Sequence, residues 1–248
     1  MVAAARGYKC LFTMPEDISA EKIELMRTLG AEVRLCPCVP FSDSRQYVHA
    51  AKRIAETLGS SGYLTSQFEN LANYRSHLAT TGPEIWEQTS GRIDGFVSAA
   101  GVSEFLKSKL PKVQVHLIDP PGSGLKSFVE NGVFQSSGSC HIEGIGIMRK
   151  TANFEHALID GAMLGTDEEA IEMGYYLLRN EGFFVGPSAA LNVCGAVKLA
   201  RKLGPGHTIV TILCDTGERY RTKMYNPEWL KEKDLVPKAQ GRSLDFLK

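Results

Sequence analysis

Short β-branched apolar runs alternate along the chain with stretches whose apolar residues recur every three or four positions. The first pattern is typical of buried strands and the second of amphipathic helices. Their regular alternation predicts an α/β fold with parallel sheets and helices on both faces. Strands are expected at 10–12, 32–35, 63–65, 93–98, 113–118 and 208–213, and helices at 19–30, 47–58, 83–89, 102–110, 166–182 and 188–203.

Some boundaries carry signals of their own. Thr166 is followed three residues later by Glu169, the capping-box pattern in which each side chain bonds the other residue's backbone N–H. Between 128 and 160 the periodicity weakens, which predicts a long functional or domain-linking segment. The polar stretch at 227–248 is predicted to be a surface tail that consists of a surface helix followed by a frayed end.

Two places interrupt this order. The chain opens on MVAAARGYK, which is typical of a helix end capped by Gly7, so we expect an upstream segment to be missing. At 96–106 a strand-like run passes through Ala100 and Gly101 into a helix-like run with almost no loop. Strand-to-helix loops usually have about two to six residues and often carry ligand chemistry. We therefore expect an internal deletion here.

Composition narrows the function classes. With 248 residues, 43% of them hydrophobic, the chain can form one large domain or two modest ones. Its 28 basic residues balance its 28 acidic ones, so no net field favours nucleic acid or an anionic membrane. Apolar runs reach strand length only, and the N-terminus lacks the sections of a signal peptide. Small molecules or proteins are the expected partners, and a cytoplasmic location is expected for the chain as written.

The six cysteines predict reduced thiols, because they lie mostly in apolar patterns without the paired spacing of a disulfide scaffold. Cys36 and Cys38 are the one close pair. No histidine or second cysteine pair stands near them in sequence, so a metal or redox role is not favoured. No metal site is predicted.

Three segments resemble a known family, namely QFENLANYRSHLATTGPEIWEQ at 67–88, EGFFVGPSAALNVCGAVKLARKL at 181–203 and IVTILCDTGERY at 209–220. Together they resemble the cysteine synthases, which belong with cystathionine β-synthase to the fold-type-II pyridoxal-phosphate enzymes. The run at 7–33 is similar to the small domain of that family, and HIEGIG at 141–146 to its domain-closure segment. DPPGSGL at 119–125 is similar to a fungal-type second cysteine synthase, which is often mitochondrial.

The resemblance implies the architecture and the chemistry. It implies two parallel-type α/β domains, the small one incomplete, with 1–66 as its remainder and 67–226 as the large cofactor domain. It implies a β-replacement in which an activated serine such as O-acetylserine exchanges its leaving group for sulfide. The cofactor implied is pyridoxal phosphate, which acts as the electron sink. Implied partners are a small amino-acid substrate and, as a homodimer or a mixed pair, a second subunit of the family.

Three residues match the family's cofactor-binding positions. Ser188 matches the serine whose hydroxyl bonds the pyridine nitrogen of the cofactor, although Ala189 and Ala190 replace the family's common Ser-Gly pattern after it. Asp215 and Thr216 match a turn beside the cofactor ring. Each has a structural alternative. Ser188 after Pro187 could have no role other than the N-cap of a helix, and an Asx-turn alone would explain Asp215 and Thr216.

Three further residues match substrate-binding positions. Gln67 matches a glutamine whose amide contacts the substrate carboxylate, and an amide N–H suits that anion. Gly144 and Gly146 match glycines at the mouth of the site, where a missing side chain lets the backbone approach the substrate. The alternatives are a loop glutamine that bonds its local backbone and two glycines that only form a turn.

The resemblance also implies that both cofactor anchors are missing. The family's Schiff-base lysine lies before the position where this chain starts, and Lys9, Lys22, Lys107 and Lys198 do not occupy its place. The family's Gly-Thr-Gly-Gly-Thr loop, a nest of N–H groups that binds the phosphate, would stand where this chain runs directly from AAG to VSEF. We therefore expect no catalytic residue here, and an inactive, truncated and internally deleted chain.

Two other functions stay open at this point. The chain could be a non-catalytic binding module that pairs with a complete homologous subunit. It could also be a nicotinamide or methyl-donor enzyme, but no G-x-G-x-x-G follows a strand.

Overall fold

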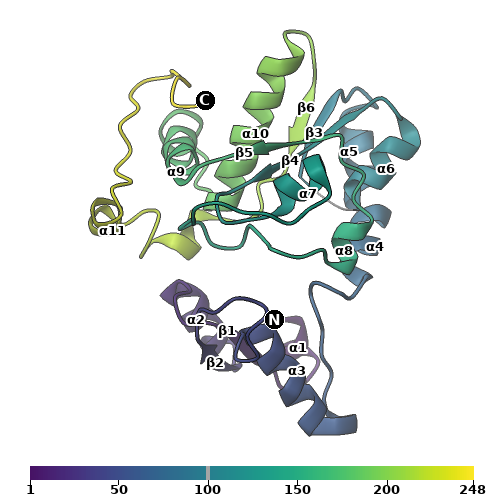
Figure 1. The fold of residues 1–248 in the computed structure, drawn as a ribbon, viewed down its shortest axis with the longest axis vertical. Coiled ribbons are helices and arrows are strands. Elements are labelled where there is room, and N and C mark those ends of the chain that lie inside the picture. Colours follow the sequence, from purple (N-terminus) through teal and green to yellow (C-terminus); the bar gives the residue numbers. More distant parts are fainter. Residues whose placement is uncertain (99–100) are drawn as a thin grey trace. The chain divides into compact units, whose positions relative to one another are not determined.

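The chain folds into two compact units, which Figure 1 shows with the sequence coloured from purple to yellow. The computed structural model describes residues 1–98 and 101–248, so Ala100 of the predicted deletion point lies outside the described residues. The first unit comprises Met1–Ser66 and Glu218–Asn226, and the second comprises Gln67–Gly217 and Pro227–Lys248.

The first unit is built on a two-stranded parallel sheet. β1 (Leu11–Pro15) pairs with β2 (Glu32–Cys36), in register from Leu11 opposite Glu32. The crossover is α2 (Ala20–Thr28), and α3 (Tyr47–Leu58) packs on β1. The short α1 (Val2–Ala5) and the 3-10 turn η1 (Gly59–Ser61) complete the unit.

Residues 218–226 belong to this first unit, whereas the sequence analysis assigned them to the large domain. Two hydrogen bonds hold this segment to the first unit. The backbone N–H and the hydroxyl of Thr222 each donate to the Glu21 carboxylate over 2.7 Å. Most of the 3-10 turn η3 (Gly217–Tyr220) lies in this segment.

The second unit carries a four-stranded parallel sheet in the order β5-β4-β3-β6. Its strands are β3 (Gly95–Val97), β4 (Gln114–Asp119), β5 (Gly161–Leu164) and β6 (Ile209–Thr211). Its helices are α4 (Ala72–Ala79), α5 (Thr81–Gln88), α6 (Val102–Lys109), α7 (Leu125–Asn131), α8 (Ala152–Glu155), α9 (Asp167–Tyr176) with the π-helical turn η2 (Leu177–Glu181), α10 (Pro187–Leu203) and α11 (Pro227–Glu232). The predicted α/β class with parallel sheets is confirmed.

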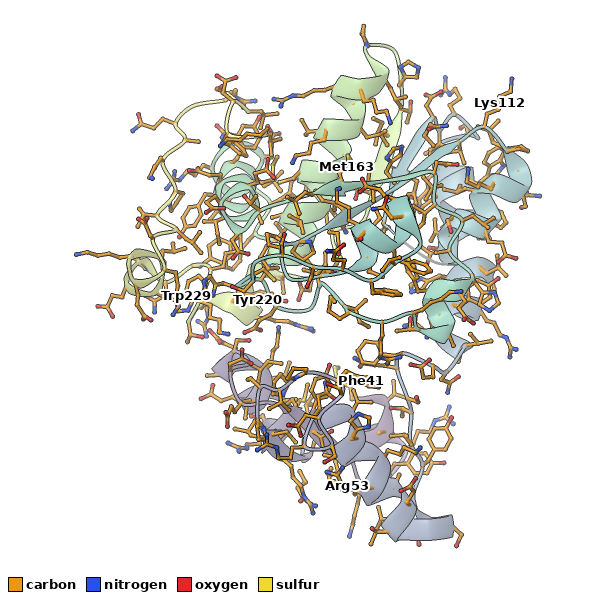
Figure 2. The ribbon with its side chains drawn as sticks, in the orientation of Figure 1. Phe41, Arg53, Lys112, Met163, Tyr220 and Trp229 are labelled. Carbon is orange, nitrogen blue, oxygen red and sulfur yellow. The ribbon has the colours of Figure 1, made fainter. Side chains whose placement is uncertain are left out.

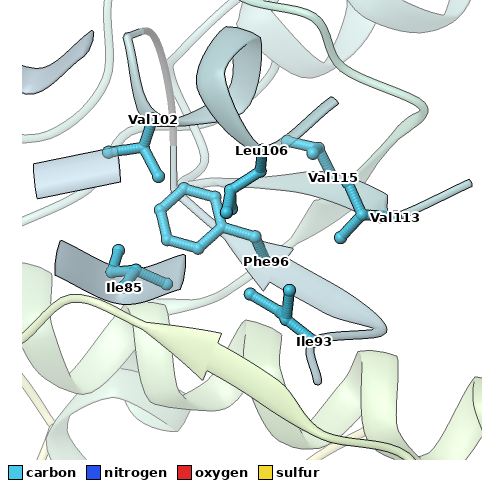
Figure 3. Close-up of a cluster of buried hydrophobic side chains, with 7 residues drawn as sticks. All are labelled: Ile85, Ile93, Phe96, Val102, Leu106, Val113 and Val115. Atoms are coloured by element: carbon cyan, nitrogen blue, oxygen red, sulfur yellow. The ribbon is translucent and has the colours of Figure 1, made fainter. Parts of the chain in front are cut away.

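Alternate residues of the central strands face opposite helix layers. Phe96 of β3 and Val115 of β4 point toward α5 and α6, where they join a fully buried apolar cluster (Figure 3). Val97 faces α10, since a Cβ added at Gly195 of α10 would lie 2.8 Å from Val97 Cγ1. Gly195 therefore lets α10 lie close against the sheet.

The strand expected at 63–65 does not form. Residues 62–66 have no regular structure, Tyr63 is 79% exposed, and no strand of the described chain pairs with them. The run Tyr-Leu-Thr is β-prone, but a strand needs a neighbouring strand to satisfy its backbone groups.

The C-terminal residues are more closely packed than a surface tail. Leu230, Leu235 and Leu247 are buried in the second unit. The Lys238 and Ala239 N–H groups donate to the Glu172 carboxylate of α9 over 2.6 and 3.0 Å. Over the described residues, no helix has the length and apolar character needed to cross a membrane.

Candidate functional site

The candidate site is built at the carboxyl ends of the parallel strands in the second unit. The segments that leave β3, β4 and β6 begin at residues 98, 120 and 212. This is the edge at which open α/β sheets bind their ligands. The predicted residues Ser188, Gly146 and Asp215 all lie on or beside these segments.

Ser188 is the second residue of α10, which begins at Pro187 with Gly186 as its N-cap residue. The structural alternative for Ser188 is therefore wrong, because Ser188 lies inside the helix and no side chain caps it. Burial raises the pKa of the Cys214 thiol, and the Ser188 hydroxyl beside it opposes that increase. Ser188 is thus tied to the residue that precedes Asp215.

Two backbone bonds fix the turn after β6 beside this helix start. The Gly186 N–H donates to the Asp215 carbonyl over 3.0 Å, and the Gly217 N–H donates to the Phe184 carbonyl over 3.1 Å. Thr216 forms an antiparallel bridge with Val185. The structure therefore brings Ser188, Asp215 and Thr216 together at one end of α10.

One residue of this site was missed by the sequence analysis. The Asn192 amide, one turn further along α10, donates to the Ile212 carbonyl at 3.0 Å and to the Cys214 thiol at 3.4 Å. A lone asparagine inside an apolar helix was the available signal, because a buried amide needs polar partners.

The segment 141–147 is held against the carboxyl end of β4. The Ser123 hydroxyl accepts from the Ile147 N–H at 2.9 Å, and Asp167 accepts from the His141 N–H at 2.7 Å. Burial raises the pKa of Asp167, and the bond from the His141 backbone opposes that increase. The ring of His141 also lies edge-on to Trp229 of α11, labelled in Figure 2, with centroids 6.1 Å apart.

Gly144 and Gly146 lie between these two anchors, both with positive φ of 81° and 93°. A Cβ at Gly146 would approach the Pro120 ring to 3.2 Å and the Ser123 side chain to 3.3 Å, while a Cβ at Gly144 would meet open space. Positive φ alone explains both glycines as turn residues. The open space at Gly144 also suits an approaching ligand.

Gln67 is exposed and is organised by a different residue. The Asn153 amide donates to the carbonyls of Gln67, Phe68 and Asn70 over 3.1, 2.8 and 3.2 Å, and its oxygen accepts from the Tyr74 N–H. Among the described residues, no hydrogen bond joins Gln67 to Ser188 or to the turn after β6. The structure therefore places Gln67 with α4 and α8.

The sequence predicted almost no loop between β3 and α6, but four positions, 98–101, separate the two elements, which is within the usual length of a strand-to-helix loop. Gly101 has φ 81°, and a Cβ there would lie 2.7 Å from the Tyr74 carbonyl oxygen and 2.8 Å from His77 Cβ. The first turn of α6 therefore packs directly on α4.

Side chains enclose this helix start further. The Tyr74 hydroxyl donates to the carboxylate of Glu104 in the first turn of α6, and this bond, helped by burial, raises the pKa of Tyr74. The Tyr74 ring stacks on His156 with centroids 4.3 Å apart, and the Ser103 hydroxyl accepts from the Leu158 N–H at 3.1 Å. A carboxylate therefore stands in the first turn of α6, at the positive end of the helix dipole.

The helix lysines are held by acceptors. Lys107 Nζ lies 2.7 Å from an Asp160 oxygen, and Lys198 Nζ lies 2.8 Å from a Glu169 oxygen. Lys22 stacks over the Tyr220 ring at 4.3 Å. An ion-paired ammonium is a poor nucleophile, because its lone pair carries a proton.

The cysteines and the acidic residues show no metal centre. All six cysteines are free thiols, Cys36 and Cys38 included. Among residues 1–98 and 101–248, no group of three or more histidine, cysteine, aspartate or glutamate side chains could hold a metal ion.

Comparisons with known proteins give the family context. The family profile described as "Pyridoxal-phosphate dependent enzyme" matches residues 1–215. A cysteine synthase from Dictyostelium discoideum is 43% identical over 266 aligned positions, which cover 100% of this chain and 70% of that protein. A Saccharomyces cerevisiae relative, whose name provisionally describes a mitochondrial cysteine synthase, is 37% identical over 95% of this chain and 65% of its own length.

A solved structure agrees with these relatives. The crystal structure of the O-acetylserine dependent cystathionine β-synthase from Helicobacter pylori matches with a TM-score of 0.80 at 30% identity. The match covers 90% of this chain and 72% of that chain.

Proposed function

The chain belongs to the family of pyridoxal-phosphate dependent enzymes and is similar to cysteine synthases, and from this premise we propose that it is a cysteine-synthase-like chain that does not perform β-replacement by itself. Pyridoxal phosphate is the cofactor of the family. The fold is the fold-type-II architecture of its structural relative.

The observation that supports this proposal most directly is the packing of the described start of α6 against α4 and Tyr74. A phosphate loop needs several consecutive backbone N–H groups that face an open space. Here Gly101 packs on α4, and Glu104 with its Tyr74 donor stands at the helix start. The alignment with the Dictyostelium protein is longer than this chain, which supports the loss of positions inside it.

In this proposal the residues predicted to lie beside the cofactor ring are better preserved than the phosphate site. Ser188 and the turn at Asp215 and Thr216 lie together, as the family's cofactor positions require. The substrate positions Gln67, Gly144 and Gly146 are present as residue types, and an amino acid such as O-acetylserine is the substrate class that they would suit. Without a phosphate anchor, these residues lack the group that they would orient.

The alternative is a non-catalytic module that pairs with a complete homologous subunit. The observation that favours it is the sheet of the first unit, which has only two strands in the described chain and leaves Phe12 and Leu35 exposed. A two-stranded sheet is marginal in isolation, so a partner would stabilise it. Homodimer formation is the other form of this proposal.

We also propose a cellular compartment for the chain and another for the enzyme that it resembles. The chain as written would act in the cytoplasm, while the enzyme that it resembles would be mitochondrial. The name of the yeast relative supports the second part.

A turnover assay tests the loss of catalysis that both functions share. The purified chain is supplied with pyridoxal phosphate, O-acetylserine and sulfide, and cysteine is measured. We expect no cysteine above the protein-free control, and saturable production would contradict the proposal. Adding a complete cysteine synthase then tests the alternative, because a stable mixed pair in native mass spectrometry supports a binding module.

A further inference from the structure

A small cavity lies away from the candidate site, between the end of α9 and the C-terminal segment. Its volume is about 60 Å³, and its wall includes Glu172, Tyr176, Arg179, Asn180, Gln240 and Gly241. A cavity of roughly 10–15 Å³ already holds one water molecule. This cavity therefore has room for a group of carboxylate size.

The walls of this cavity are fixed by hydrogen bonds. Both oxygens of Glu172 accept from backbone N–H groups, of Lys238 at 2.6 Å and of Ala239 at 3.0 Å. The Asn180 amide donates to the Gly241 carbonyl at 3.0 Å and to the Tyr176 carbonyl at 3.2 Å. Glu172 and Asn180 thus hold the segment 238–241 in place.

The wall also contains Arg179, whose guanidinium N–H groups donate to no carboxylate among the described residues. Its guanidinium lies over the Tyr175 ring, 4.9 Å from the centroid, and within the described residues no acidic side chain pairs with it. The nearby Glu181 pairs instead with Arg242 at 3.4 Å. A stacked guanidinium keeps its in-plane N–H groups free, and these match a carboxylate.

The local backbone adds a second observation. Arg179 lies in the π-helical turn Leu177–Glu181, which continues α9 with one wider turn. Such turns are rare and frequently mark functional sites. Here the turn places Arg179 and Asn180 beside the same cavity.

We propose that this cavity binds the carboxylate of a small organic acid. Arg179 supplies the charge, and the Tyr176 hydroxyl and the Gln240 amide supply neutral donors. The Glu172 carboxylate in the wall repels any anion, but it repels a doubly charged phosphate more strongly than a singly charged carboxylate. The proposal does not depend on the cofactor site.

The test is a titration of the full chain with sodium acetate, replacing chloride at constant ionic strength, followed by backbone amide NMR shifts. We expect saturable shifts confined to residues 176–181 and 239–241. Inorganic phosphate is titrated in the same way and is expected to bind at least tenfold more weakly. Non-saturable acetate shifts, or tighter phosphate binding, would overturn the proposal.

Two variants make the test specific. Arg179→Gln keeps the stem and an amide but removes the charge, and we expect at least a tenfold loss of acetate affinity. Arg92→Gln, the same change at an exposed arginine before β3, is the matched control and should leave affinity unchanged. Unchanged binding by Arg179→Gln would overturn the proposal, and its spectrum outside the cavity reports whether it is folded.

Discussion

Tyr74 is the residue that most clearly connects local chemistry to the proposed function. Its hydroxyl donates to Glu104, its ring stacks on His156, and its carbonyl lies against Gly101. One side chain thus fills the space beside the start of α6, the helix end at which we propose that the phosphate site is lost. The phenol is buried, so its bond to Glu104 also stabilises the fold.

Tyr74→Phe should lower the free energy of unfolding by about 1–2 kcal/mol, because a bond to a charged acceptor is lost and Glu104 keeps no donor in its place. Tyr8→Phe, the same change at a side chain that is 72% exposed, is the control and should change stability by less than about 0.5 kcal/mol. Urea denaturation followed by circular dichroism measures both. Equal stability of the two variants would contradict this role for Tyr74.

His116 makes the stability of the second unit dependent on pH. The side chain is 3% exposed, neither ring nitrogen has a partner in the described structure, and its ring lies against Gly161, where a Cβ would meet it at 2.7 Å. Burial lowers the pKa of His116, the charges of Lys202 and Lys107 lower it further, and Asp160 opposes them.

The fold therefore favours neutral His116. Its stabilising contribution is complete above the unfolded-state pKa of about 6.5 and is lost as pH falls below it, by at most about 1.4 kcal/mol per pH unit. His116→Leu should flatten the fall in stability between about pH 6.5 and 5. His207→Gln, at an exposed histidine, should leave the pH dependence of stability unchanged. Identical pH profiles of wild type and His116→Leu would show that His116 does not cause this dependence.

At the scale of elements, helix α9 shows how local sequence sets a boundary. Thr166 accepts from the Glu169 N–H at 3.2 Å, and Glu169 accepts from the Thr166 N–H at 3.2 Å, which confirms the predicted capping box. Glu169 also pairs with Lys198 of α10, so the cap joins two helices.

Thr166→Ala should lower the free energy of unfolding by about 1 kcal/mol, because the helix loses the acceptor for one N–H group. Thr166→Ser keeps that acceptor and should recover most of the loss. Thermal unfolding of the three proteins gives the comparison. An alanine variant as stable as the serine variant would mean that the capping box does not contribute.

Elements with complete local signals could be predicted, and elements that depend on tertiary contacts could not. The helix at 47–58 was predicted at its observed bounds, since its apolar spacing is helical throughout. The strand β5 was not predicted, because Gly161–Leu164 is short and forms only against β4. Helices α4 and α7 were missed for a similar reason, as their sequences lack a clear apolar face.

The candidate site followed the same division. Ser188, Asp215 and Thr216 could be proposed from sequence because they lie in short motifs that resemble a family, and their roles toward the cofactor stay predictions. Asn153 and Tyr74 could not, because their roles arise from contacts with residues far away in the chain. Short motifs indicate which residues could bind a cofactor, whereas tertiary packing decides whether the space beside them is open.

At the scale of the whole molecule, the two units differ in how much core they bury. The second unit buries Phe96, Leu106, Ile118, Leu191 and Leu199 almost completely. The first unit leaves Phe12, Leu25, Leu29 and Leu35 exposed to between 39% and 47%. Since apolar burial is the main stabilising term, the first unit should be the weaker one.

Hydrogen exchange of the intact chain tests this difference. Amides of β1 and β2 should exchange at least tenfold faster than those of β3 and β4, because their two-stranded sheet opens more easily. The comparison uses peptides of one protein under one condition, so no variant is needed. Equal protection in the two units would show that the first unit is held as firmly as the second.

We propose that the start of α6 is closed to the phosphate of pyridoxal phosphate. The most direct measurement is a visible absorption titration of the purified chain with pyridoxal phosphate and with pyridoxal, each followed by borohydride and peptide mapping. We expect no saturable spectral change, no preference for the phosphorylated compound, and no lysine modified in stoichiometric amount after borohydride reduction. Saturable binding of pyridoxal phosphate in preference to pyridoxal, with one lysine fixed, would contradict it.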